Sequence, residues 1–327
     1  MAKPSFTVFD YRVRPAKSVE RKMLCEAFRR LSFFEPVKSY RYIGFGSTTF
    51  TDFILIHKAL DITDMISIEK RKNYETRFEF NRPFHCVKMK YGDSNKVLPE
   101  LTWDKRTIIW LDFEGHLTAS ELQDVAYAAM NMVSGSMLVV TLNVGDYWLS
   151  PECLKELSRQ ECRLEKLKED VGIEKVPGDI EGKHLVGGGS MARTFRRLIM
   201  NEIDQVLRDR NGLSSAEHEV RYQPLLNFHY SDRANMLTVG GVFYEERDKA
   251  TLKQCEFESL DFVRPDDTPY EIELPILTPR ERQYLDKALP KGAVKEATET
   301  IGLTEGEIQR YARLYRHYPL FVEVELS

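Results

Sequence analysis

Residues 40–53, YRYIGFGSTTFTDF, place a short apolar run directly before Gly44-Phe45-Gly46-Ser47-Thr48 and a helical pattern directly after it. Glycine lets the backbone turn tightly and come close to a ligand, and the first turn of a helix offers free amides to polar groups. The stretch therefore predicts a strand, a ligand-binding turn and a helix. A Gly-x-Gly turn is also common without a ligand, so its meaning depends on the strands beyond it.

Strand and helix patterns alternate up to residue 144. The fold class that this alternation predicts is α/β: a Rossmann-like doubly wound sheet, mostly parallel and covered by helices on both faces. Ser18 is the expected N-cap of the first helix. The predicted strands cover 40–43, 65–69, 86–91, 107–113 and 136–144, and the predicted helices 18–31, 50–60, 72–80 and 119–133.

The rest of the chain predicts additions to this sheet. Residues 150–212 form a charged helical insertion, in which Gly187-Gly188-Gly189-Ser190 is either a mobile lid or a linker. Aromatic runs on both sides of residues 231–235 predict a C-terminal antiparallel hairpin. Thr278 and Thr304, each three residues before a glutamate, predict two capped helices in a helical tail. We expect a helical lead-in at 1–39, a Rossmann-like domain at 40–250, and a linker with a helical appendage at 251–327.

Composition sets the broad class of the protein. The chain has 327 residues, of which 42% are hydrophobic and 30% charged, as in ordinary globular proteins. Its formal net charge of -4 argues against a nucleic-acid partner, because such proteins bind by neutralising phosphates. No apolar run is long enough to span a membrane, so we expect a cytoplasmic protein without a membrane partner. The oligomeric state is left open.

Five cysteines are scattered along the chain: Cys25, Cys86, Cys153, Cys162 and Cys255. None of them shows the Cys-x-x-Cys spacing of a metal or redox motif. The sequence therefore predicts buried thiols rather than a zinc site or a disulfide framework.

Polar residues stand at the ends of the second, third and fourth predicted strands. Glu69 follows Gly46 by 23 residues, a spacing at which a carboxylate can accept hydrogen bonds from both hydroxyls of a ribose. Asp93 and Ser94 end the third strand, where Asp93 could accept a hydrogen bond from an adenine amine. Asp112 ends the fourth strand. Because the carboxyl ends of parallel strands share one edge of the sheet, this set predicts a site for an adenosine-containing ligand.

The order of these elements resembles the class I S-adenosylmethionine (SAM)-dependent methyltransferases, over roughly residues 16–246, and more specifically bacterial proteins grouped as O-methyltransferases. The resemblance implies SAM as the cofactor and Asp112 at the methyl-transfer site. Two positions depart from the family pattern: Tyr42 stands where an acidic residue is common, and Thr48 where a third glycine is common. The cofactor-binding residues that the resemblance implies are Gly44, Gly46 and Ser47 for the methionine part, Glu69 for the ribose, and Asp93 and Ser94 for the adenine.

The residues after the fourth predicted strand bear on the methyl acceptor. Enzymes that methylate amino groups of DNA bases resemble one another in an Asp/Asn-Pro-Pro-Tyr/Phe turn, and this chain has Asp112-Phe113-Glu114-Gly115 instead. Metal-dependent O-methyltransferases resemble one another in a carboxylate here and an Asp-Asn pair after strand five. Asp112 fits that pattern, but strand five ends in Leu142-Asn143, and only Glu114 or Asp146 could substitute. A divalent metal such as magnesium is therefore possible but not favoured.

Two residues are candidates for catalysis. Asp112 is the first, and His116 is the second because its ordinary pKa suits proton removal near neutral pH. The sequence thus predicts methyl transfer to an oxygen or other non-base acceptor, on a small molecule or a protein. The alternative is a catalytically inactive SAM- or nucleotide-binding module that serves a protein partner through its C-terminal helices. We expect Gly46→Val to damage ligand binding more than stability.

Overall fold

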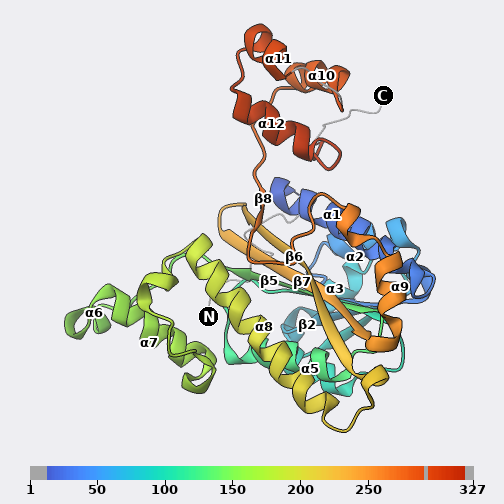
Figure 1. Cartoon of the computed structure of the whole chain (residues 1–327), viewed down its shortest axis with the longest axis vertical. Helices are drawn as coiled ribbons and strands as arrows, with labels where there is room; N and C mark the ends of the chain where they lie inside the picture. Colours follow the sequence, from blue (N-terminus) through green and yellow to red (C-terminus); the bar gives the residue numbers. More distant parts are fainter. Residues whose placement is uncertain (1–12, 291–293, 321–327) are drawn as a thin grey trace.

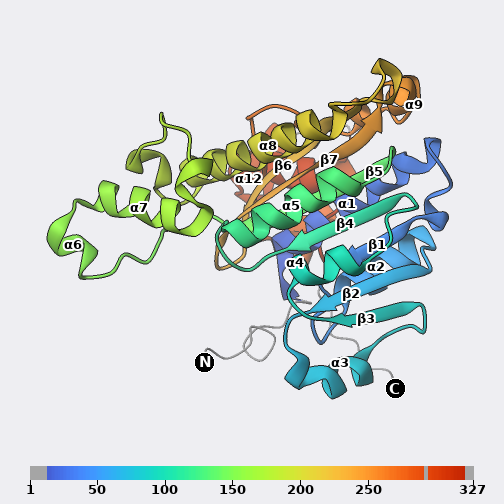
Figure 2. The same ribbon diagram turned by 90° about the horizontal axis from the view of Figure 1, so that it is seen from below.

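The computed structural model describes residues 13–290 and 294–320. It contains an eight-stranded sheet in the order β3-β2-β1-β4-β5-β7-β6-β8. The first five strands pair in parallel, and the order reverses between β1 and β4, where such sheets bind ligands. The predicted α/β Rossmann-like class is confirmed (Figures 1 and 2). The strands are β1 (Arg41–Gly44), β2 (Asp64–Glu69), β3 (Val87–Tyr91), β4 (Thr107–Asp112) and β5 (Ser136–Asn143).

The remaining strands extend the sheet beyond β5. The hairpin of β6 (Val220–Ser231) and β7 (Asn235–Glu245) is antiparallel, with its turn where the sequence predicts it. β7 runs antiparallel to β5, and the short β8 (Tyr270–Ile272), which the sequence analysis does not predict, lies parallel to β6. The hairpin turn therefore ends at the same edge as the carboxyl end of β5.

Helices cover both faces of the sheet, because alternate side chains of each strand point to opposite faces. On one face α1 (Pro15–Arg30) and α2 (Thr51–Leu60) pack on Tyr42 and Trp110. On the other face α5 (Ala119–Asn131) and α8 (Gly189–Asn211) pack on Ile109 and its neighbours. Ser18 does not cap α1, since the helix begins at Pro15, where the fixed φ of proline suits a first helical position. Shorter helices are α3 (Glu75–Asn81), α4 (Ser94–Val97) and α9 (Lys249–Gln254).

Residues 150–188 form an arm that projects from the sheet. It carries α6 (Cys153–Glu156) and α7 (Arg159–Val171) and lies to one side of the main body in both ribbon views (Figures 1 and 2). α8 instead lies against α5 and fills part of the core. Of the glycine-rich loop, Gly189 and Ser190 already belong to the first turn of α8.

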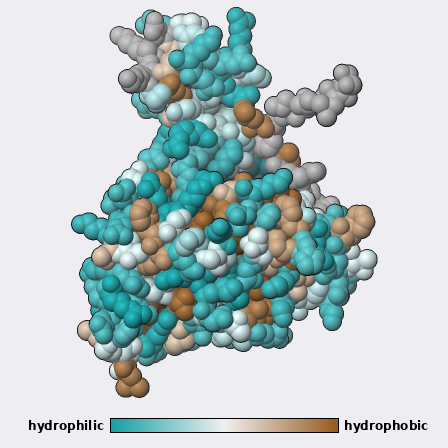
Figure 3. Space-filling view, turned by 90° about the vertical axis from the view of Figure 1, so that its right-hand side faces the viewer, coloured by the Kyte–Doolittle hydropathy of each residue, from teal (hydrophilic) through white to brown (hydrophobic). Residues whose placement is uncertain are grey.

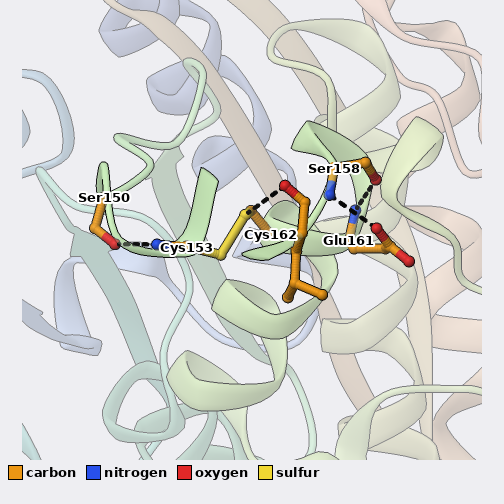
Figure 4. The surroundings of a disulfide bond; sticks show 6 residues. Ser150, Cys153, Ser158, Glu161 and Cys162 are labelled. Atoms are coloured by element: carbon orange, nitrogen blue, oxygen red, sulfur yellow. Dashed lines mark hydrogen bonds between the residues drawn. A yellow bond between two sulfur atoms is a disulfide. The ribbon is translucent and has the colours of Figure 1, made fainter. Parts of the chain in front are cut away.

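The prediction that the cysteines are thiols is wrong for one pair. Cys153 and Cys162 form a disulfide in the arm, with their Cα atoms 6.0 Å apart (Figure 4). The chain reverses between α6 and α7 at Ser158, whose side chain caps α7, and this reversal brings the two sulfur atoms together. A spacing of nine residues carries no motif, so the pairing depends on a turn that the sequence analysis does not identify. Cys25, Cys86 and Cys255 are free thiols.

The C-terminal helices form a small group of their own above the sheet (Figure 1). α10 (Pro279–Ala288) and α12 (Glu305–Leu314) begin with the two predicted capping boxes, and α11 (Val294–Ile301) lies between them without having been predicted. Leu285, Ile308 and Tyr311 are part of a separate apolar cluster. On the face shown in Figure 3, apolar residues are scattered among hydrophilic ones. No helix in the described part of the chain is both long and apolar enough to cross a membrane.

Candidate active site

A cavity of about 1020 Å³ opens at the carboxyl ends of the parallel strands. The sequence-predicted residues that line it come from four successive strand ends, as expected for a parallel sheet. Two predicted residues, Gly44 and His116, do not line the cavity. The predicted residues that line it are Gly46, Ser47, Glu69, Asp93, Ser94 and Asp112.

The turn after β1 is held by hydrogen bonds to β2. The Gly46 amide donates to Ser67 Oγ at 3.0 Å, and the Ser47 amide donates to Glu69 Oε1 at 2.7 Å. Ser47 has a positive φ of 54°, which exposes its amide toward the carboxylate. Among the described residues Ser47 Oγ finds no hydrogen-bond partner, although the atom is buried. A buried hydroxyl without a partner is unfavourable, and Ser47 is one of the residues that line the cavity.

The two glycines of this turn are needed for packing. A Cβ on Gly46 would lie 2.5 Å from the Phe50 ring and 2.7 Å from Ser67 Oγ. A Cβ on Gly44 would lie 2.7 Å from the hydroxyl of Tyr42. The Tyr42 ring thus stands beside Gly44. Gly44 makes room for this ring and does not reach the cavity.

Glu69 is a deeply buried carboxylate of the cavity wall, with 9% of the residue exposed. Burial raises its pKa to about 7, against the lowering effect of the Ser47 amide and the Ser67 hydroxyl. Both of these hydrogen bonds go to Oε1, so the second carboxylate oxygen has acceptor capacity left. Glu69 can therefore accept hydrogen bonds from a ligand in the cavity, and does so best once ionised.

Asp93 and Ser94 form the next part of the wall, where β3 meets α4. Asp93 accepts a hydrogen bond from Lys70 Nζ at 2.8 Å, and this contact lowers the pKa of Asp93. Ser94 Oγ donates to Asp124, a fully buried residue of α5 whose pKa burial raises to about 7. Both predicted residues thus have fixed positions at the cavity.

Asp112 ends β4 and forms an ion pair with a buried lysine that the sequence analysis does not name as a site residue. Lys17 Nζ lies 2.7 Å from Asp112 Oδ1, and the side chain of Lys17 is 0% exposed, whereas that of Asp112 is 20% exposed. Lys17 comes from α1, 95 residues earlier in the chain. The helical pattern of residues 18–31 predicts α1, but only the folded chain shows that α1 reaches the end of β4.

Asp112 is therefore part of a buried polar network. Lys17 Nζ also contacts Glu20 Oε2 at 2.8 Å and Tyr230 Oη at 3.3 Å. Glu20 accepts hydrogen bonds from Tyr230 and from Thr238 of β7. Burial raises the pKa of Glu20 above its ordinary value. The network joins α1, β4, β6 and β7 directly beneath the cavity.

His116 lies away from this network. Its Nε2 donates to the Gly145 carbonyl at 2.9 Å, and its ring packs 4.7 Å from the ring of Tyr147. A second ring, that of Phe195 on α8, lies 6.2 Å away. This placement supports a packing role for His116 and does not bring it to the cavity as a base.

The donor set does not fit a divalent cation. Within residues 13–290 and 294–320, no three His, Cys, Asp or Glu side chains gather closely enough to hold one. The Lys17 ammonium lies against one oxygen of Asp112, and Asp146 pairs instead with Arg163 of the arm. These side chains therefore do not form a metal site.

Residues 9–326 match the sequence profile of a family described as "Putative O-methyltransferase". The chain belongs to this family. The match covers the sheet, the arm and the C-terminal helices. It confirms the resemblance to O-methyltransferases that the sequence analysis describes. No match was found among curated proteins.

Several solved structures are similar to parts of this chain at low identity. Trm1 from Pyrococcus horikoshii, in complex with SAM, is 12% identical, with a TM-score of 0.43 over 72% of this chain and 57% of Trm1. The O-methyltransferase TomG from Streptomyces achromogenes, also with SAM, is 13% identical, with a TM-score of 0.35 over 74% of this chain and 91% of TomG. An O-methyltransferase family protein from Burkholderia thailandensis is 10% identical, with a TM-score of 0.30 over 63% of this chain and 51% of that protein. These likenesses are too distant to assign a ligand to this chain.

Proposed function

We propose that this protein transfers the methyl group of SAM to an oxygen acceptor. The observation that carries the proposal is the position of Glu69. It lies at the end of β2, receives the Ser47 amide of the glycine turn, and faces the same cavity as Asp93 and Asp112. Membership of the O-methyltransferase family supports the reaction class.

The residues of the cavity fit the cofactor. Ser47 Oγ is a buried hydroxyl that lacks a partner among the described residues, and it would bind the methionine part. Glu69 would accept hydrogen bonds from the ribose hydroxyls, and Asp93 one from the adenine amine. Ser94, fixed by Asp124, would bound the adenine pocket. Bound here, SAM supplies an electrophilic methyl group on a positively charged sulfur.

Asp112 would act on the acceptor. Methyl transfer to a hydroxyl is a displacement, so the enzyme aligns the oxygen and takes up its proton as the new bond forms. Asp112 is partly exposed to the cavity, and Lys17 holds its other side. A carboxylate fixed in this way can accept the hydrogen bond of an acceptor hydroxyl and then its proton.

The segment after β4 bears on the methyl acceptor. The segment after β4 reads Asp112-Phe113-Glu114-Gly115, which supports an acceptor other than a DNA base. We keep a small molecule or a protein as the acceptor. The cytoplasmic location stays a prediction, and the Cys153–Cys162 disulfide does not support it, because such bonds persist mainly in oxidising compartments.

Calorimetric titration with SAM and S-adenosylhomocysteine (SAH) tests cofactor binding. We expect the parent protein to bind both ligands and Glu69→Ala to lose at least about tenfold in affinity, since charge-assisted hydrogen bonds contribute about 1.5–3 kcal/mol each. Glu100→Ala is the matched control, because Glu100 is exposed and does not line the cavity. Unchanged affinity in a folded Glu69→Ala protein would remove Glu69 from the site.

A second assay separates an enzyme from a binding module. The protein is incubated with methyl-labelled SAM and cell extract, and the label is followed into small molecules and proteins. Transfer of label supports the methyltransferase. Binding of SAM without transfer to any fraction would favour the alternative, an inactive module that serves a protein partner.

A further inference from the structure

Lys17 occupies a position that is costly for a lysine. Its ammonium is completely buried, and each of its three N–H groups has an acceptor: Asp112, Glu20 and Tyr230. It also lies 4.4 Å from the centroid of the Trp110 ring. Replacing a buried ion pair by apolar groups is often neutral or stabilising, so stability alone gives no reason for a lysine here.

Asp112 connects the buried network to the cavity. From Trp110 Nε1 a chain of hydrogen bonds runs through Thr141 and Thr238 to Glu20, and from Glu20 to Lys17. These residues are at most 2% exposed. Asp112, at the end of the chain, is half-buried and lines the cavity. What the network fixes in the cavity is therefore the position and charge of one carboxylate.

We infer that Lys17 is a positioning residue for Asp112, and that the Lys17–Asp112 pair sets how the site discriminates between SAM and its product SAH. The inference rests on the proposed function. The two ligands differ by the methyl group and by the positive charge on sulfur. A carboxylate facing the cavity favours the charged ligand, and an ammonium behind it reduces this preference. Lys17 thereby keeps the site from holding SAM too tightly relative to SAH.

The ratio of the two dissociation constants, Kd for SAH divided by Kd for SAM, measures this discrimination without any acceptor. Glu20 complicates the measurement, because this carboxyl also contacts Lys17 and can offset the loss of the lysine by taking up a proton. The substitutions at Lys17 and Asp112 are therefore made in a protein that already carries Glu20→Gln. Glutamine keeps the size of the side chain. Its one carbonyl oxygen can accept from Tyr230, while its amide group donates to the Thr238 hydroxyl.

In this background the charges at Lys17 and Asp112 cancel, and each substitution has a defined sign. Lys17→Met leaves a net negative charge, so the ratio should rise about fivefold. Asp112→Asn leaves a net positive charge, so the ratio should fall about fivefold. Both magnitudes correspond to unit charges about 10 Å apart in a partly hydrated site. The protein with all three substitutions should return to the ratio of the Glu20→Gln background. Opposite shifts that cancel indicate charge, since loss of packing would not be reversed by a second substitution.

Lys22→Met in the same background is the matched control. Lys22 lies on the same helix, binds the carbonyl of His317 and does not line the cavity, so the ratio should stay unchanged. If the Lys17→Met protein does not fold, the Asp112→Asn protein and the triple variant still differ only at Lys17. The triple variant should then show the higher ratio.

Two results overturn the inference. Folded variants that all share the ratio of the background would show that Lys17 and Asp112 do not affect discrimination. Shifts of the same sign for Lys17→Met and Asp112→Asn would show damage to the site instead of a charge effect. A parent protein that binds neither ligand is a different failure, because it overturns the proposed function and the inference falls with it.

Discussion

The two ends of the cavity are built from different ranges of the sequence. The end proposed to hold the cofactor is lined by Ser47, Glu69 and Asp93, which come from consecutive strand ends. The Ser47 amide donates to the Glu69 carboxylate of the neighbouring strand. The end proposed for methyl transfer contains Asp112, which accepts a hydrogen bond from Lys17. Lys17 also contacts Tyr230, 213 residues away in sequence. The residues of the cofactor end are brought together by the order of consecutive strands along the chain. The transfer end exists only once α1 and the hairpin pack on the sheet.

The largest effect that we expect tests whether the glycine turn serves the ligand alone. Gly46→Val should lower the melting temperature by several degrees as well as abolish SAM binding, because its Cβ would lie 2.5 Å from Phe50 and 2.7 Å from Ser67 Oγ. Overpacking of this kind typically destabilises by about 1–3 kcal/mol. The sequence alone led us to expect damage mainly to binding; the contacts of the added Cβ predict a loss of stability as well.

Gly115→Val is the control for that substitution. A Cβ on Gly115 would have no heavy atom within 4 Å, so the same change should leave melting and binding close to those of the parent. Calorimetry measures both quantities. A Gly46→Val protein that melts with the parent but binds no SAM would restore the original expectation and make the turn a pure ligand site.

Asp112→Asn should affect turnover much more than cofactor binding. Asparagine keeps the shape of the side chain but cannot take up a proton, so turnover on the labelled acceptor should fall at least about hundredfold. Affinity for SAM should change by less than about tenfold, since the cofactor end is intact. Asp146→Asn, which alters a carboxylate paired with the arm, should change neither. Full turnover by Asp112→Asn would exclude Asp112 from catalysis.

The pH dependence of SAM binding probes the cofactor end alone. Burial raises the pKa of Glu69 to about 7, and the ribose hydroxyls need the ionised form as acceptor. Affinity should therefore be highest above pH 7 and fall by up to about tenfold per pH unit below it. The free energy of unfolding changes in the opposite sense. A raised pKa in the folded state adds stability below the ordinary value of 4.5, and this contribution is lost as the pH rises to about 7.

Glu69→Gln should weaken binding and make it independent of pH between about 5.5 and 7.5. Asp124→Asn is the matched control, because burial also raises the pKa of Asp124 to about 7 while this residue does not line the cavity. Its affinity should keep the pH dependence of the parent, even where the altered contact with Ser94 lowers the affinity at every pH. A Glu69→Gln protein that keeps the parent profile would show that another group titrates.

These outcomes bear on how far the sequence alone leads. The sheet could be predicted, and so could six residues that line the cavity, because residues that follow apolar strands lie at one edge of a parallel sheet. Lys17 could not be selected, since a lysine in an amphipathic helix is ordinarily a solvated residue and only tertiary contact buries it. His116 stands four residues after Asp112 but turns toward Tyr147. The disulfide depends on a reversal of the arm that no spacing indicates.

The smallest effect concerns the arm, which belongs to neither end. Cys153→Ser opens a loop closed over nine residues, and such a cross-link contributes about 2–3 kcal/mol by restricting the unfolded chain. The loss should be local: limited proteolysis should cut the segment between α6 and α7 sooner, and reductant should make the parent protein equally sensitive. Affinity for SAM should change by less than about twofold, because neither cysteine lines the cavity. Cys86→Ser, at a free thiol outside the arm, should alter neither cleavage nor affinity. If Cys153→Ser weakened SAM binding as much as Glu69→Ala does, the arm would have to close over the cavity in the bound state, and the site would have a third contributing region.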